Sequence, residues 1–160
     1  MTEIRIICVG KVKEPHYRKG IDHFLKMIRR KCTVSILECP DQPTPDQGSQ
    51  AVEKQILQVE GERILSRIRR EDYVVALCID GKQYSSEEWT LLIRKWTDRA
   101  ASSGGALVFV IGGSLGLSDA VVRRAAVKLS FSALTFPHQM MRMSLCEQLA
   151  RALEQSGTMM

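Results

Sequence analysis

The most constraining feature of this chain is a continuous apolar run at residues 73–79 (YVVALCI), which is followed by Asp80 and Gly81. An apolar run without alternating polar residues is typical of a strand that is covered on both faces, as in a parallel sheet. Residues 106–111 (ALVFVI) form a second run of this kind. The two runs predict a mostly parallel sheet that lies between two layers of helices.

The rest of the chain alternates between short apolar runs and segments with helical periodicity. The predicted strands cover residues 3–10, 33–39, 73–79, 106–111 and 127–131. The predicted helices cover residues 15–30, 49–68 and 86–101, a short segment after Ser118, and a segment that begins near Pro137 or His138. We expect a turn at residues 80–82 and a surface loop at residues 40–48. This order predicts one α/β domain over residues 1–160, with helices on both faces of the sheet.

Composition limits the compartment and the partners. No apolar run approaches the roughly 20 residues of a membrane span, and no signal-peptide pattern is present, so we expect a soluble, cytoplasmic protein without a membrane partner. The five cysteines lack metal-ligand spacing and indicate buried thiols rather than a metal or redox site. The net charge of +5 permits a polyanionic partner. Basic clusters at residues 29–31, 67–70 and 123–124 could serve such a partner or could be solvated helix faces.

Two loops follow the ends of predicted strands close together in the sequence. Residues 112–116 (GGSLG) lead to Ser118 and Asp119, which suit a helix N-cap and first turn. Residues 132–138 (SALTFPH) follow the next strand. Ligands of open α/β sheets bind outside the carboxyl ends of the strands, so this pair of loops is the best candidate for a small-molecule site. The glycine loop matches neither GxGxxG nor a Walker A loop, and a tight turn without a ligand stays open as an alternative.

The candidate reactive side chains are few. No G-x-S-x-G elbow is present, which argues against a serine nucleophile. His138 lies in the second loop, and Arg142 lies one helical turn further on the same side. Together they could meet a phosphate or a base edge. The alternatives are a histidine that only caps the helix and an arginine that is solvated.

Three segments carry a resemblance to a known family. They are residues 109–118 (FVIGGSLGLS), residues 129–138 (LSFSALTFPH), and Arg142 with the following Glu147-Gln148-Leu149. The chain resembles the RlmH family of SPOUT-class methyltransferases, which act on large-subunit ribosomal RNA. The opening around Gly10 and the helix around Gly61 also fit, so the resemblance covers nearly the whole chain.

The resemblance implies a fold, a cofactor and a substrate. The fold would be a SPOUT-type α/β knot, with a trefoil knot in the C-terminal part. The chain would be a homodimer with its active site at the subunit interface, and it would methylate N3 of a pseudouridine in 23S ribosomal RNA. S-adenosylmethionine would be held by three loops, whose residues are Leu77, Gly112, Phe131, Ser132, Ala133, Leu134, Thr135 and Phe136.

The resemblance also allows roles to be assigned to side chains. Leu77, Leu115, Leu134 and Phe136 could supply the apolar walls of the cofactor pocket. His138 is the candidate for removing the N3 proton or orienting the base, and Arg142 is the candidate for holding the RNA. Both are treated as catalytic-site hypotheses, and no metal is expected.

Two departures from the family pattern matter. Relatives usually end with Tyr-His and a basic residue, whereas this sequence ends at Met160 without them, and Ser114 stands where proline is usual. If that ending completes the RNA site, the chain would bind the cofactor and methylate poorly. An alternative hypothesis is therefore a non-catalytic RNA- or ribosome-binding knot protein. A third hypothesis is a nucleotide-binding α/β protein without either function.

Overall fold

The computed structural model describes residues 2–43 and 48–158, and side chains as far as residue 155. Within these residues, the sheet has five parallel strands in the order β2-β1-β4-β3-β5. The strands are β1 (Glu3–Val9), β2 (Thr33–Cys39), β3 (Tyr73–Lys82), β4 (Leu107–Ile111) and β5 (Val127–Leu129). The helices are α1 (Pro15–Arg29), α2 (Gln50–Leu65), α3 (Ser86–Ser102), α4 (Asp119–Arg124) and α5 (His138–Thr158). The predicted α/β class and order of elements are confirmed, while the trefoil knot stays a prediction.

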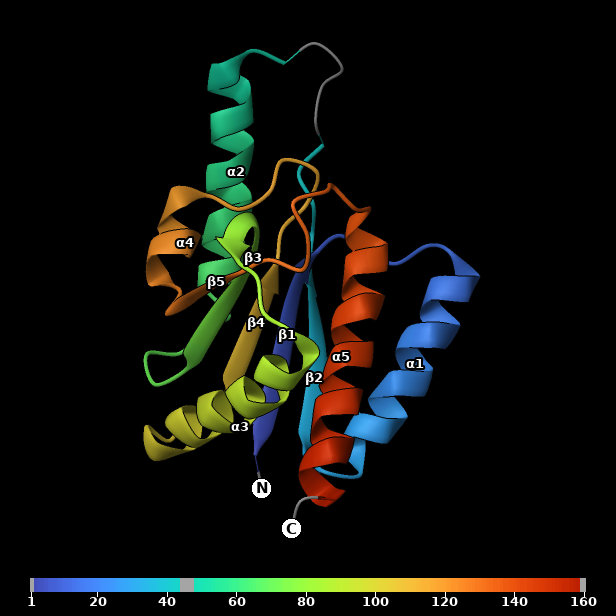
Figure 1. Cartoon of the computed structure of the whole chain (residues 1–160). Coiled ribbons are helices and arrows are strands. Elements are labelled where there is room, and N and C mark those ends of the chain that lie inside the picture. The colour runs from blue at the N-terminus through green and yellow to red at the C-terminus, as the bar shows by residue number, and fades with distance from the viewer. Residues whose placement is uncertain (1, 44–47, 159–160) are drawn as a thin grey trace.

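The helices form a layer on each face of the sheet (Figure 1). One core joins α1, α3 and α5 to the sheet, and its aromatic centre is Trp89, Trp96 and Phe109. The smaller core on the other face joins α2 and α4 to the sheet through Ile64 and Val121. Strands that are covered on both sides explain why the two central sequence runs contain no alternating polar residues.

The third strand differs from its prediction. A turn was expected at residues 80–82, but Asp80, Gly81 and Lys82 belong to β3. The pairing with β5 is irregular, because Leu77 and Lys82 both pair with Leu129. A Cβ at Gly81 would lie 2.7 Å from the backbone of Leu129, so only glycine permits this close approach. Residues 78–80 lie within this irregular part of β3.

Gly61 has a packing role within α2. A Cβ at this position would lie 2.4 Å from Oγ of Ser118. The Ser118 hydroxyl is the N-cap of α4 and accepts a hydrogen bond from the Val121 amide at 3.4 Å. Gly61 therefore lets α2 pack directly on the start of α4. The loop predicted at residues 40–48 lies partly outside the described residues, because 44–47 are not described.

The amino end of the sheet, where the strands begin, carries a buried polar network centred on Asp72. Its carboxylate accepts hydrogen bonds from Nη1 of Arg5 at 2.9 Å, from the Arg69 amide at 2.7 Å and from the Ala106 amide at 2.9 Å. Burial alone would raise the pKa of Asp72, but these hydrogen bonds outweigh it and hold the pKa below its ordinary value. Nη2 of Arg124 also donates hydrogen bonds to the backbone carbonyls of Arg69 and Asp72.

The three basic clusters of the sequence also belong to this end. Residues 29–31 end α1 and lead toward β2, residues 67–70 lie between α2 and β3, and residues 123–124 end α4 just before β5. Each cluster thus precedes the start of a strand, opposite the loops that follow the strand ends. Among the described residues, no helix is long and apolar enough to cross a membrane, and no three candidate ligands are grouped for a metal ion.

Candidate functional site

A cavity of about 610 Å³ lies at the carboxyl end of the sheet, outside the ends of β3, β4 and β5. The predicted cofactor residues that line it are Leu77, Gly112, Phe131, Ser132, Leu134, Thr135 and Phe136. Ala133 and Leu115 belong to the same loops but do not line it, and Leu117 takes the place of Leu115. The structure therefore brings Leu77 of β3 together with two loops that lie more than thirty residues later in the sequence.

The glycine loop after β4 is a tight turn that brings backbone to the cavity wall. A Cβ at Gly112 would lie 2.3 Å from the carbonyl oxygen of Gly116, so the two backbones touch. Gly116 has φ of +83°, a conformation that side chains with a Cβ adopt at a cost. Its amide donates to the Gly113 carbonyl at 3.1 Å. The glycines thus leave backbone groups, rather than side chains, to meet a ligand.

The buried carboxylate of Glu60 supports this loop from α2. Its Oε2 accepts a hydrogen bond from the Gln42 amide at 2.9 Å. Its Oε1 lies 3.4 Å from where a Cβ of Gly113 would be. Glu60 therefore fixes the segment after β2 beside the glycine loop. No pattern in the sequence predicts this contact, because a glutamate in an amphipathic helix is ordinarily solvated.

The loop between β5 and α5 is shaped by serine side chains. Oγ of Ser130 donates to the Ser132 carbonyl at 2.9 Å, and Oγ of Ser132 accepts from the Leu134 amide at 3.0 Å. This local bonding turns the loop outward and leaves Leu134 69% and Phe136 38% exposed. Apolar side chains held in solvent around a cavity are typical of a binding site.

An ion pair lies at the mouth of the cavity. Nζ of Lys128 donates to Oδ2 of Asp80 at 2.9 Å, and this hydrogen bond raises the pKa of Lys128 and lowers that of Asp80. Both residues line the cavity, as does Cys78. Sequence reasoning missed them because it treated residues 80–82 as a turn and residues 127–131 as a plain strand. Burial raises the pKa of the Cys78 thiol, which keeps it protonated.

His138 begins α5 and lines the cavity. It is half-buried, and its Nδ1 is buried without a hydrogen-bond partner among the described residues. Burial and then the positive charge of Arg142 lower the pKa of His138, while Asp41 opposes them. The imidazole is therefore neutral near pH 7 and has a lone pair that can accept a proton or a hydrogen bond.

Arg142 lies one turn beyond His138, as the spacing predicted, but it does not line the cavity. Its side chain is 2% exposed, with Nη1 donating to Oε2 of Glu38 at 2.7 Å and Nη2 donating to the Gly10 carbonyl at 3.1 Å. These bonds join α5 to the ends of β1 and β2. In this chain the Arg142 guanidinium therefore holds the first turn of α5, which includes His138, against β1 and β2. A direct contact of Arg142 with RNA stays a prediction.

The comparisons with known proteins decide the family. A family model described as "Predicted SPOUT methyltransferase" matches residues 2–156. This chain belongs to the SPOUT methyltransferase family. The cavity of this SPOUT methyltransferase is lined largely by residues of the two segments, 109–118 and 129–138, that carried the resemblance. The motifs and the cavity therefore indicate the same site.

Relatives sharpen the placement within the SPOUT methyltransferases. The chain is 45% identical over 150 residues to "Ribosomal RNA large subunit methyltransferase H" of Streptococcus uberis, covering 94% of this chain and 92% of that one. It is 47% identical over 149 residues to the protein of the same name from Clostridioides difficile, covering 93% and 92%. A Bifidobacterium animalis protein of this name is 47% identical over 151 residues, covering 94% and 93%. The resemblance stated from the sequence is confirmed.

A solved structure shows the same fold at low sequence identity. The crystal structure of a probable methyltransferase from Bordetella pertussis superposes with a TM-score of 0.52 and 16% identity, covering 95% of each chain. At this identity the likeness shows the SPOUT fold alone.

Proposed function

We propose that this chain is an S-adenosylmethionine-dependent methyltransferase of large-subunit ribosomal RNA and that it methylates N3 of a pseudouridine. One observation carries the proposal: in a SPOUT methyltransferase, the irregular part of β3 and the loops after β4 and β5 converge on one cavity of about 610 Å³. The names of the relatives, which specify large-subunit ribosomal RNA, support the substrate class.

The residues that line the cavity suit the cofactor because they combine exposed backbone with apolar side chains. The contact of Gly112 with Gly116 leaves room for close backbone approach, and Leu77, Leu134 and Phe136 supply apolar surface for an adenosyl group. We assign binding to Leu77, Gly112 and the loop from Phe131 to Phe136. S-adenosylmethionine would supply an electrophilic methyl group, so the remaining tasks of the protein are alignment and removal of one proton.

His138 is assigned to that proton. N3 of a pseudouridine loses its proton as the bond to the methyl carbon forms, and a neutral imidazole at the cavity wall can accept it. The lowered pKa of His138 keeps the acceptor form available at neutral pH. Arg142 serves the site by holding the start of α5 on Gly10 and Glu38. Contact of Arg142 with RNA would require the guanidinium to leave both partners.

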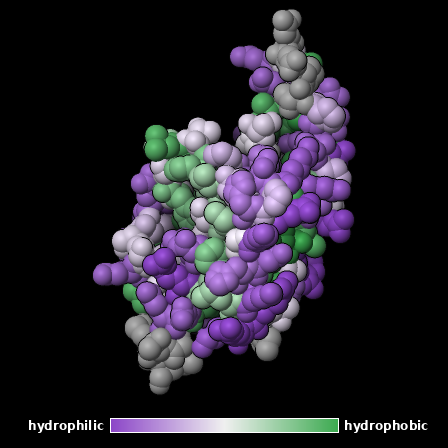
Figure 2. Space-filling model, turned by 90° about the vertical axis from the view of Figure 1, so that its right-hand side faces the viewer, coloured by the Kyte–Doolittle hydropathy of each residue, from purple (hydrophilic) through white to green (hydrophobic). Residues whose placement is uncertain are grey.

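In this proposal the chain works as a homodimer whose site is completed at the subunit interface. Figure 2 shows the face on the side of α1 and α5, which is mostly hydrophilic but carries a group of apolar side chains toward the upper left of the view. An apolar patch with a polar border is typical of a protein interface. Sedimentation velocity at micromolar concentration tests it, and a monomer under these conditions would contradict it.

The proposed function is tested by methyl transfer. Ribosomes from a strain that lacks the modification are incubated with the protein and labelled S-adenosylmethionine, and the modified nucleotide is located by mass spectrometry. We expect transfer to one pseudouridine of the large-subunit RNA. Cofactor binding by calorimetry without transfer would favour the RNA-binding protein without catalysis, and absence of both would overturn the proposal.

A further inference from the structure

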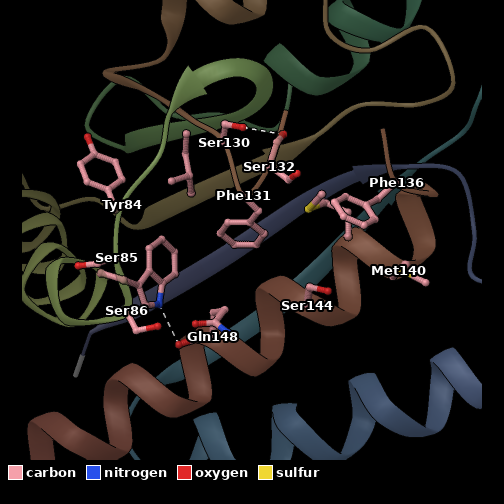
Figure 3. A pocket seen from close by; sticks show the side chains of 13 residues that line it. Tyr84, Ser85, Ser86, Ser130, Phe131, Ser132, Phe136, Met140, Ser144 and Gln148 are labelled. Carbon is pink, nitrogen blue, oxygen red and sulfur yellow. Dashed lines mark hydrogen bonds between the residues drawn. The ribbon is translucent and has the colours of Figure 1, made fainter. Parts of the chain in front are cut away.

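A second cavity, of about 330 Å³, lies beside the first and between α3 and α5 (Figure 3). We call it the α3–α5 cavity; its characteristic lining residues are Tyr84, Ser86, Trp89, Met140, Ser144 and Gln148. The two cavities share the wall formed by residues 129–132 with Phe136 and Met141. A ligand in one cavity would therefore lie next to a ligand in the other.

The α3–α5 cavity combines aromatic rings with free polar groups. In Figure 3, Phe131 lies between Tyr84 and Phe136, with Ser144 and Gln148 of α5 below it. Phe131 is fixed by an edge contact with Trp89, whose ring centroid lies 5.8 Å away. Trp89 in turn donates from Nε1 to the Gln148 carbonyl at 2.9 Å. The ring of Phe131 is thus a rigid surface on which a planar group could stack.

The polar groups of this cavity are uncharged. The hydroxyls of Ser86 and Ser144 have no hydrogen-bond partner among the residues that the structure describes. Gln148 uses its amide nitrogen on Glu147 at 3.2 Å, and its amide oxygen stays available. No lysine, arginine or carboxylate lines the cavity. This chemistry suits a neutral planar ring with donors and acceptors on its edge and does not suit a phosphate.

We propose that the α3–α5 cavity binds the acceptor pyrimidine base of the RNA, turned out of its stack. This inference rests on the proposed function. Proteins that read single-stranded RNA stack bases on aromatic rings and hydrogen-bond their edges, and enzymes that modify a base move it into a pocket. A base on Phe131 would meet the hydroxyls of Ser86 and Ser144. Its N3 edge would face the shared wall and the first cavity, which His138 lines.

The first test fills the cavity. Ser144→Leu places a larger side chain in it, and Ser102→Leu makes the same change at the exposed end of α3, outside both cavities. We expect Ser144→Leu to lower kcat/KM for methyl transfer to ribosomes by about tenfold or more, because base stacking is lost. Affinity for S-adenosylhomocysteine by calorimetry should stay unchanged. Ser102→Leu should leave both quantities unchanged.

The second test observes the cavity directly through Trp89. Trp96→Phe leaves Trp89 as the tryptophan that reports, since the chain has two. We expect pseudouridine at millimolar concentration, with S-adenosylhomocysteine present, to quench the fluorescence of Trp89 in this variant. The double variant Trp96→Phe/Ser144→Leu is the control for light absorbed by the nucleoside, and it should show less quenching.

The two tests separate this inference from the function on which it rests. Equal quenching in the single and double variants, or wild-type transfer by Ser144→Leu, would overturn the base site and leave the methyltransferase proposal standing. Weaker S-adenosylhomocysteine binding by Ser144→Leu would also overturn it, because the cavity would then belong to the cofactor. A wild-type protein that transfers no methyl group would contradict the proposed function, whereas the fluorescence comparison needs no transfer.

Discussion

At the amino end of the sheet the buried Asp72 carboxylate accepts three hydrogen bonds. At the carboxyl end, Nδ1 of His138 and Nε of Arg142 are buried and have no partner among the described residues. The buried Asp72 carboxylate is therefore fully used within the fold. At the carboxyl end, apolar side chains are held in solvent and two cavities remain.

This contrast separates stability from function within one sheet. A buried polar group with all its hydrogen bonds stabilises the structure. A buried polar group without a hydrogen bond lowers the stability of the fold, and a ligand that bonds to it restores part of that free energy. In open α/β sheets the strand ends are where ligands bind. The difference between the two ends of this sheet predicts that substitutions at the amino end change unfolding, and that substitutions at the carboxyl end change binding and transfer.

The largest expected effect is on stability at the amino end. Asp72→Ala leaves Nη1 of the buried Arg5 and the Ala106 amide without their acceptor, although Nη2 of Arg5 still donates to Glu3. We therefore expect the free energy of unfolding to fall by about 3–5 kcal/mol. Urea denaturation measures it. The folded fraction should bind S-adenosylhomocysteine with wild-type affinity. A loss of affinity in that fraction would break the contrast between the two ends.

The next effect is on catalysis at the carboxyl end. His138→Gln keeps a polar side chain of similar size at the cavity wall and removes the proton acceptor, so transfer should slow by about a hundredfold or more. Single-turnover transfer to ribosomes measures it, and calorimetry should show unchanged cofactor affinity. Transfer at the wild-type rate would remove His138 from the mechanism.

Two glycines offer a matched comparison of the ends. Gly116 at the carboxyl end and Gly104 at the amino end have φ of +83° and +75°, and an added Cβ would meet nothing within 4 Å at either. Alanine at each should lower the free energy of unfolding by about 1 kcal/mol through backbone strain. Only Gly116→Ala should also weaken cofactor binding, because Gly116 lines the cavity. Equal binding by both variants would show that the glycine loop does not shape the cofactor site.

RNA affinity should also differ between the ends. Lys11 and Lys13 are exposed in the loop after β1. The Lys13 amide donates to Oε1 of Gln139 in α5 at 3.2 Å, which places this loop beside the start of α5. Lys11→Ala/Lys13→Ala should lower the slope of log affinity against log salt by about 1–2, since each lost phosphate contact contributes about 0.7–0.9. Arg29→Ala/Arg30→Ala, at the amino end, should leave the slope unchanged. The opposite result would place the RNA on the amino end.

The smallest effect is a pH dependence of stability. Because the pKa of His138 is lowered from its ordinary 6.5, the unfolded chain binds a proton below that pH that the folded chain does not. The free energy of unfolding should therefore fall as pH drops from about 6.5 toward the lower folded pKa. The difference between wild type and His138→Gln, from urea denaturation at several pH values, isolates this contribution. A difference that stays constant with pH would contradict the lowered pKa.

Much of this arrangement could be predicted from the sequence because it depends on local signals. The apolar runs, the Ser118 cap and the start of α5 at His138 each follow from neighbouring residues. The irregularity of β3 could not be predicted, because it depends on contact between Gly81 and Leu129, far away in the chain. The burial of Arg142 likewise depends on Glu38, 104 residues earlier.

The candidate site divides in the same way. That the loops after β4 and β5 would meet could be predicted, because each follows a strand end and strand ends meet at one end of a parallel sheet. The α3–α5 cavity depends on how two helices pack around Phe131, which no spacing in the sequence encodes. The loop pattern alone left the ligand open between a nucleotide and none, and the proposal of S-adenosylmethionine rests on the resemblance to the family.

Hydrogen–deuterium exchange with and without S-adenosylhomocysteine tests the central claim most directly, because it reports both ends of the sheet in one experiment. We predict slower exchange at residues 111–117 and 129–138, and unchanged exchange at residues 66–72. Protection confined to the amino end, or no protection at a saturating concentration of S-adenosylhomocysteine, would contradict the assignment of the cofactor site.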